Sequence, residues 1–409
     1  MISQGLHSNR HLAFLLTAAG TVLGLAGIDL VLPAIPAMPA HLGGGAEGAQ
    51  FAIAAFVAGT ASGLLIFGSI GPRFGRRQTL IAALSAYATL SLACALCDRM
   101  VFLVTLRFLQ GVAASAPAVF APSVIRSLYD DTGATKAFGV LGSIESLVPA
   151  LAPAVGIVLL RFGGWTASFI VTSALAALLA LTIQFVDSMP FKSNPERATG
   201  SYLRLLRSGV FLRYALSHAF VLGGLLIFVF GSPFVIVRTM QGVIGQFITM
   251  QIVGVACFIV SANATGFLVR RYGSELLILS GTLLAAGAAL LILLYAIAGG
   301  RDPSMLIYLF FPMNIGLGLR GPPGFFQALT AGGGDDERAA SMTILAIMAV
   351  SAAGTALLAP FIRHGLVALA AAATLSQGFA VIVLAFLPRF RPHADVILSS
   401  LSNPQDETP

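Results

Sequence analysis

The sequence predicts an all-α membrane protein whose twelve spanning helices form two related six-helix bundles. The 409 residues are 57% hydrophobic and 10% charged, with a mean hydropathy of +0.92, whereas soluble proteins carry about 25% charged residues. A spanning helix needs roughly 20 apolar residues, and the chain offers twelve such runs. Two similar loops, one in each half of the chain, indicate an internal repeat.

The twelve apolar runs follow one another with short polar connections. The expected spans are 11–33, 49–71, 78–97, 101–125, 137–160, 165–187, 210–236, 243–268, 276–298, 304–330, 340–361 and 365–388. They divide the chain into a first bundle at 1–188, a linker at 189–209, a second bundle at 210–390 and a tail at 391–409. Part of the linker, Tyr202 to Arg207, has an amphipathic pattern that predicts a short helix on the membrane surface.

The two similar loops follow the second and the eighth apolar run. Their matched positions, each 198 residues apart, are Gly68–Gly266, Arg73–Arg271, Phe74–Tyr272 and Gly75–Gly273. Parallel repeats of this kind are typical of transporters that rock one half against the other around a central site.

The distribution of basic residues predicts how the chain is oriented. Sixteen of the 23 Lys and Arg residues fall at the termini or in even-numbered connections, five fall in odd-numbered connections, and Arg107 and Arg320 fall inside spans. Basic residues accumulate on the cytoplasmic side of membrane proteins, so both termini are expected in the cytoplasm. The net charge of +7 is thereby explained by topology, and we expect the lipid bilayer, not nucleic acid, as partner.

Several sequence patterns that mark enzymes do not occur. The chain has no Walker-type phosphate loop, no His-Glu-x-x-His zinc motif and no Gly-x-Ser-x-Gly nucleophile motif. We therefore expect no enzymatic activity, no cofactor and no metal.

Four segments carry a family pattern: the loop 68–77, the Asp29-bearing stretch 28–36, the arginine motif 106–111 and the proline-rich stretch 149–156. They resemble the major facilitator superfamily and, more narrowly, its twelve-span drug:proton antiporters of the Bcr/CflA type. The resemblance implies the major facilitator fold and proton-coupled export of small organic compounds by alternating access. We expect the protein to be a monomer in a bacterial inner membrane. It assigns conformational roles to Gly68, Arg73, Gly75, Arg76, Arg77, Pro149, Pro153 and Gly156.

Three features depart from that family. Pro72 stands where the family has an acid that helps to lock the cytoplasmic side, and Glu145 lies in a helix that is apolar in the family. The third is the stretch 320–324, where Arg320 precedes two prolines and two glycines. This stretch predicts an interruption of the tenth helix, because prolines remove backbone hydrogen bonds.

Asp29 and Arg107 are charged residues inside predicted spans, where a charge is costly unless it is paired or faces water. With a rise of about 1.5 Å per residue, they lie roughly 6 Å and 9 Å below the outer surface. The similar depths predict a pair. In one interpretation Asp29 couples transport to protons and Arg107 controls its protonation; in the other the pair only holds two helices together.

Glu145 and Arg320 lie in the inner half, roughly 12 Å and 6 Å from the inner face. Glu145 is a second candidate for proton coupling, and Asp29 and Glu145 are both candidates for substrate binding. Arg320 has three interpretations: a contact with Glu145 that bridges the halves, binding of an anionic substrate, or snorkelling to the inner surface. Further candidates for substrate contact are His218, Gln251 and Asn314.

Three functions compete on this basis. The first is a proton-coupled exporter of a small, drug-like organic compound. The second is a transporter of an anionic metabolite, such as a carboxylate siderophore or an organic acid, recognised by Arg320. The third is a membrane receptor on a transporter scaffold, which the short loops and short tail disfavour.

Overall fold

The computed structural model describes residues 2–43, 45–186 and 201–389. Every regular element in these ranges is helical. The long helical segments are α1 (Ile2–Asp29), α3 (Gly45–Phe74), α4 (Arg76–Leu96), α5 with α6 (Met100–Ala114 and Ala116–Leu128), α7 (Asp131–Gly163), α8 (Ala167–Phe185), α10 (Gly209–Phe234), α11 (Ile244–Tyr272), α12 (Ser274–Ile297), α13 (Met305–Ala331), α14 (Asp336–Leu358) and α15 (Leu366–Phe386). The short ones are η1 (Leu32–Ala37), α2 (Met38–Leu42), α9 (Tyr202–Arg207), η3 (Val235–Thr239) and η4 (Ala359–His364).

Each predicted span corresponds to one long helical segment, which confirms the predicted twelve-helix fold. Ten of the segments are long and apolar enough to cross a membrane, and α7 adds an eleventh as a span bent by 43° between Pro149 and Leu151. The twelfth is α13, whose Asn314, Arg320 and three prolines reduce its hydropathy. The linker helix predicted at Tyr202 to Arg207 is present as α9. Residues 187–200, which include the first part of the predicted linker, and the tail residues 391–409 lie outside the described residues.

The internal repeat is visible in the backbone of the two matched turns. Gly75, between α3 and α4, has φ +85°, and Gly273, between α11 and α12, has φ +80°. Only glycine adopts such angles without a steric penalty. The two turns therefore use the same conformation at the same position of each half.

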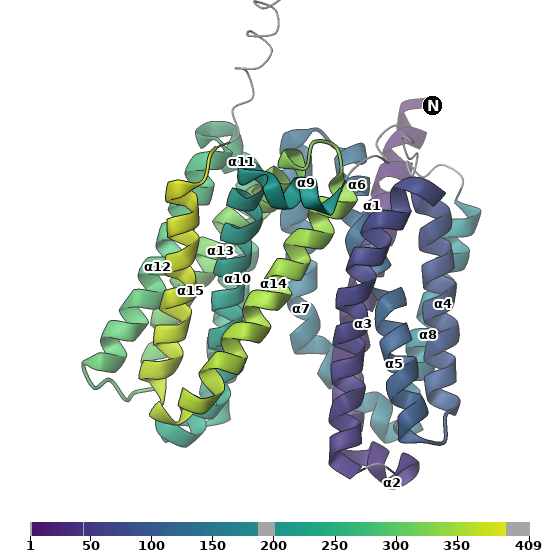
Figure 1. The fold of residues 1–409 in the computed structure, drawn as a ribbon, viewed down its shortest axis with the longest axis horizontal. Helices are drawn as coiled ribbons and strands as arrows, with labels where there is room; N and C mark the ends of the chain where they lie inside the picture. Colours follow the sequence, from purple (N-terminus) through teal and green to yellow (C-terminus); the bar gives the residue numbers. More distant parts are fainter. Residues whose placement is uncertain (1, 44, 187–200, 390–409) are drawn as a thin grey trace, which may run out of the picture.

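The helices form two six-helix bundles, α1–α8 and α10–α15 (Figure 1). The bundles meet at the end of the molecule that holds α9, and their ribbons spread apart toward the opposite end. We call the first of these the linker end. Contacts between the bundles join α3 and α6 to α14, and α7 to α11 and α13.

A mixed apolar cluster supports this junction. It combines buried residues of the first bundle, among them Ile125 and Phe138, with Phe211, Phe326 and Leu329 of the second. The rings of Phe138 and Phe325 also meet edge to face across the junction, with centroids 5.5 Å apart. Hydrophobic burial therefore holds the bundles together at the linker end.

The predicted interruption of the tenth helix is wrong, since α13 runs unbroken through Pro312, Pro322 and Pro323. Its glycines allow close packing instead. A Cβ on Gly316 would lie 2.5 Å from the carbonyl oxygen of Gly281 in α12, and one on Gly318 would lie 2.0 Å from Ser261 Oγ in α11. Neighbours this close on two sides support the continuous helix where the prolines remove hydrogen bonds.

Candidate functional site: a charged seam and a polar core

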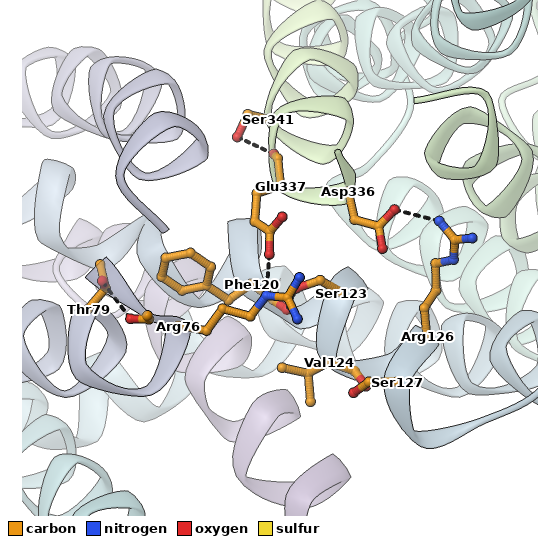
Figure 2. Close-up of polar contacts among 11 residues, drawn as sticks. Arg76, Thr79, Phe120, Ser123, Val124, Arg126, Ser127, Asp336, Glu337 and Ser341 are labelled. Atoms are coloured by element: carbon orange, nitrogen blue, oxygen red, sulfur yellow. Dashed lines mark hydrogen bonds and ion pairs between the residues drawn. The ribbon is translucent and has the colours of Figure 1, made fainter. Parts of the chain in front are cut away.

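Two ion pairs join the bundles at the linker end (Figure 2). Arg76, the first residue of α4, pairs with Glu337 in the first turn of α14. Arg126 in α6 pairs with Asp336, with 2.5 Å between Arg126 Nη1 and Asp336 Oδ1. The carboxylate side chains are only 2% (Glu337) and 10% (Asp336) exposed. Little water can reach these carboxylates to replace a lost arginine. Removing either partner of a pair is therefore expected to destabilise the contact between the bundles.

The start of α14 fixes the two carboxylates. Gly333 and Gly334, with φ +65° and +91°, turn the chain after α13, and Asp336 and Glu337 then occupy the first helical turn. Acidic side chains are favoured there by the helix dipole. Asp335 pairs instead with Arg338, at 2.7 Å between Asp335 Oδ2 and Arg338 Nη1.

The sequence interpretation missed Asp336 and Glu337, although a signal exists. Asp335-Asp336 repeats Asp130-Asp131 at the start of α7, 205 residues earlier. Because α7 and α14 are equivalent helices of the two halves, this second repeat marks the acidic helix starts. Comparing these acidic helix starts with the matched arginine loops would have placed opposite charges at the same end of the molecule.

The residues of the first matched loop have separate tasks. Gly68 lies within α3 against Ser341 of α14, Gly75 makes the turn, and Arg76 crosses to α14. Arg77 donates to carbonyl oxygens at the end of α8, with Nη2 3.2 Å from Ile183 O and 2.7 Å from Gln184 O. Arginines commonly cap helix C-termini in this way. The side chains of Pro72 and Arg73 lie outside the described part of the structure.

The predicted residues of α7 shape its path. Pro149 and Pro153 lie inside this helix, which bends next to Pro149. A Cβ on Gly156 would lie 2.4 Å from the carbonyl oxygen of Leu30, so this glycine lets α7 approach the end of α1. On the side of the second bundle, Asn263 of α11 donates to Ser143 Oγ at 2.8 Å. The helix α7 thus contacts both bundles.

The predicted Asp29–Arg107 pair is wrong. Arg107 is 1% exposed and donates through Nη1 to Gln110 Oε1 at 2.7 Å and to the carbonyl oxygen of Gly27 at 3.1 Å. Its guanidinium also lies 4.2 Å from the ring centroid of Phe56. Arg107 therefore binds the backbone of α1 two residues before Asp29, and the half-buried Asp29 side chain has no basic partner within 4 Å among the described residues.

Glu145 also lacks a basic partner in the described part of the chain. The side chain lies in α7 next to the Thr21 hydroxyl of α1, at the contact between these two helices. The predicted bridge from Glu145 to Arg320 is therefore not formed. Asp29 and Glu145 are instead two isolated carboxyl groups on neighbouring helices of the first bundle.

Arg320 lies inside the second bundle and is 0% exposed. Its guanidinium donates to the carbonyl oxygen of Ser217 at 3.0 Å and to Ser217 Oγ at 3.1 Å, both on α10. The snorkelling interpretation is wrong because the side chain turns inward to α10. His218, the next residue, is buried beside Phe325, with ring centroids 5.8 Å apart.

The other polar candidates do not share one site. Asn314 donates to the carbonyl oxygen of Phe310 in its own helix at 3.2 Å and lies against Gly254 of α11. Gln251 is half-buried on α11. The candidate site thus has two parts: a charged seam at the linker end, and a polar core in which Asp29 and Glu145 face no arginine.

Comparison with known proteins identifies the family. The family model described as Major Facilitator Superfamily matches residues 17–359, which is most of the chain. The protein belongs to the Major Facilitator Superfamily. Because members of this superfamily are transporters, the chain is a multi-pass membrane transporter and not an enzyme.

Curated bacterial relatives of this superfamily member include drug-resistance proteins. The uncharacterized MFS-type transporter YdgK of Bacillus subtilis is 34% identical over 232 residues, which span 55% of this chain and 58% of that protein. A chloramphenicol resistance protein of Pseudomonas aeruginosa is 29% identical over 304 residues, or 69% of this chain and 70% of that protein. The multidrug resistance protein MdtL of Salmonella schwarzengrund is 29% identical over 274 residues, or 65% and 69%.

Solved structures of the superfamily share the fold. The transporter FucP in the outward conformation has a TM-score of 0.72 at 15% identity, covering 93% of this chain and all of that one. The proton:xylose symporter XylE has the same TM-score at 16% identity, covering 93% of this chain and 96% of that one. At these identities the likeness establishes the fold alone.

Proposed function

We propose that this Major Facilitator Superfamily transporter is a proton-coupled antiporter that exports small, drug-like organic compounds by alternating access. The observation that carries the proposal is the pair of isolated carboxyl groups, Asp29 and Glu145, in α1 and α7. A carboxylate inside a membrane protein needs a counter-charge. Since no described arginine or lysine supplies one, a proton or a cationic substrate takes that place in turn.

The arrangement of the bundles supports alternating access. All the ion pairs between the bundles lie at the linker end, within the described residues, and the ribbons diverge toward the other end (Figure 1). We assign the linker end to the cytoplasm, since the basic loops and both described chain ends lie there. The structure then corresponds to an outward-facing state, and inward opening requires the Arg76–Glu337 and Arg126–Asp336 pairs to separate.

The names of the bacterial relatives favour export, and we propose that the protein works as a monomer in a bacterial inner membrane. Two of these relatives are named for chloramphenicol and multidrug resistance, which supports a small organic substrate. We assign proton coupling first to Asp29 and second to Glu145. Arg107 contributes by binding the carbonyl oxygen of Gly27, which fixes the α1 backbone next to Asp29.

An anionic metabolite transported through Arg320 is the second candidate. Its support is that Arg320 also lacks a carboxylate partner among the described residues. The full burial of Arg320 opposes it, because a substrate in the outward-facing state does not reach a side chain that is 0% exposed.

The test separates uphill transport from exchange in proteoliposomes. Asp29→Asn should reduce gradient-driven transport at least tenfold while substrate counterflow persists, because exchange without a gradient needs no net proton movement. Asp98→Asn, at an exposed loop position, is the matched control and should behave as the wild type. Uphill transport that survives in Asp29→Asn but is lost in Glu145→Gln would move the coupling to Glu145, and survival in both variants would refute the proposal.

A further inference from the structure

The short linker helix α9 lies across the junction of the two bundles at the linker end (Figure 1). Leu205 is 1% exposed and belongs to the mixed apolar cluster that includes residues of both bundles. Arg204 Nη2 donates to the carbonyl oxygen of Gly332 at 3.3 Å, at the end of α13. Since α10 follows α9 almost directly in the chain, α9 is attached to the second bundle.

Tyr202, at the start of α9, reaches the first bundle. Its hydroxyl donates to the carbonyl oxygen of Leu65 in α3 at 2.7 Å, and the guanidinium of Arg338 lies 5.8 Å from its ring centroid. Burial raises the pKa of Tyr202, against the opposing effects of the Ser69 hydroxyl, Arg338 and the Ser341 hydroxyl. The phenol is therefore protonated at neutral pH and acts as a hydrogen-bond donor.

Gly68 supplies the space for this contact. A Cβ at Gly68 would lie 2.4 Å from Tyr202 Oη and 2.7 Å from Ser341 Oγ. At the matched position of the other half, a Cβ on Gly266 would lie 3.0 Å from Lys136 Cβ. Gly266 thus faces only the transmembrane helix α7. Gly68 faces the transmembrane helix α14 and also the linker helix α9.

We propose that Tyr202 is a positioning residue of the transport cycle, through which the linker helix α9 ties the second bundle to α3 and holds the seam closed. This inference rests on the proposed function, since it takes the seam to be the gate that opens inward. It assigns to the linker a part in the conformational equilibrium, and to Gly68 the task of accommodating the phenol.

The contact is suited to reversible opening. The carbonyl oxygen of Leu65 also accepts a hydrogen bond from Ser69 Oγ at 3.1 Å, so it keeps a partner when Tyr202 withdraws. Separation of the bundles therefore breaks the neutral hydrogen bond from Tyr202 to Leu65 and leaves that carbonyl oxygen with a partner. Such a bond changes an equilibrium by about fivefold.

The test measures the distance between the two bundles directly, with no substrate and no proton gradient. Spin labels at Gln78 and Arg270, both exposed near the matched turns, report the separation of the bundles by electron–electron distance measurement. The background has its three cysteines replaced. Tyr202→Phe should reduce the ratio of closed to open seam about fivefold, while Tyr308→Phe, at a tyrosine 65% exposed, should leave it unchanged.

Gly68 provides a second, independent variant. Gly68→Ala should open the seam because its methyl group meets the phenol oxygen, and Tyr202→Phe should add less in that background than in the wild type. This non-additivity distinguishes direct contact from two separate effects. Purely additive effects would overturn the role assigned to Gly68 and Tyr202 together.

The Arg76→Ala variant separates this inference from the proposed gate. If Arg76→Ala opens the seam and Tyr202→Phe does not, Tyr202 has no role in closing it and the inference is refuted while the gate stands. If neither variant changes the distance, the seam is not the gate. An unchanged apparent Tm of Tyr202→Phe shows that the shift does not come from unfolding.

Discussion

The two matched turns have the same backbone but different partners. Gly75 and Gly273 share nearly the same positive φ, yet the turn at Gly75 is followed by Arg76, which crosses to the other bundle, while Gly273 is followed by Ser274. The helices that face the two turns, α14 and α7, also differ in whether they carry an acidic partner. The first turn of α14 carries Glu337, and the equivalent position of α7, 205 residues earlier, is Thr132. The repeat therefore preserves the shape of the turn and confines the charged seam to one side.

A second task of the turns is preserved with different residues. In the first half Arg77 caps the end of α8. In the second half the matched position is Glu275, whose carboxylate binds Arg213 of α10 at 3.1 Å. Arg213 then donates to the carbonyl oxygens of Leu384 and Leu387 at the end of α15. Both halves thus place an arginine on the equivalent helix end, which indicates that this cap stabilises each bundle and not the charged seam between them.

The largest effect is expected from removing the crossing arginine. Arg76→Ala leaves the Glu337 carboxylate, 2% exposed, without that arginine in the closed seam, and loss of one partner from a buried pair costs about 3–5 kcal/mol. The closed state should fall by about a hundredfold or more relative to the open state. Distance measurement between Gln78 and Arg270 checks this.

Two variants control that result. Ser274→Ala, at the matched position of the second turn, should leave the distance unchanged. Exchanging the charges, with Arg76→Glu and Glu337→Arg combined, should restore part of the closed state. An Arg76→Ala protein with the distance distribution of the wild type would contradict the asymmetry between the turns.

Intermediate effects are expected from the two caps. Arg213→Ala removes a 2% exposed arginine from two carbonyl oxygens and a carboxylate, which should cost about 2–3 kcal/mol. Arg77→Ala should cost about 1 kcal/mol, because water can reach this half-exposed site. Apparent Tm in detergent measures both losses, with the exposed Arg270→Ala as control, and neither variant should shift the closed seam as Arg76→Ala does.

The most nearly equal effects are expected at the glycines of the two turns. A Cβ at Gly75 or at Gly273 meets no atom within 4 Å, so Gly75→Ala and Gly273→Ala add only backbone strain of about 1–2 kcal/mol. Equal decreases in apparent Tm would support the shared backbone. A clearly larger loss at one turn would show that the equivalence is incomplete.

The fold was accessible from the sequence because its signals are local. Twelve apolar runs and two loops at a constant offset are sufficient to predict twelve helices in two bundles, and the structure confirms them. The interruption expected in α13 failed because a proline and glycine count does not reveal close neighbours. Gly316 and Gly318 allow α12 and α11 to pack tightly enough to support the helix.

The site was only partly predictable. Depth along a helix placed Asp29 and Arg107 at one level, but depth does not give the direction in which a side chain points, and Arg107 turns to the backbone of Gly27. Asp336 and Glu337 were missed because residues at the start of a span look like loop residues until the opposing arginines are placed in three dimensions.

The most direct test of the account is substrate-dependent proton flux in proteoliposomes that contain a pH-sensitive dye and carry an imposed proton gradient. Cationic, neutral and anionic organic compounds are compared on the wild-type protein. Proton movement is expected with lipophilic cationic or neutral compounds, and it should be lost in Asp29→Asn. Proton movement with carboxylates alone would favour transport through Arg320, and substrate transport without any proton movement would contradict the proposed antiport.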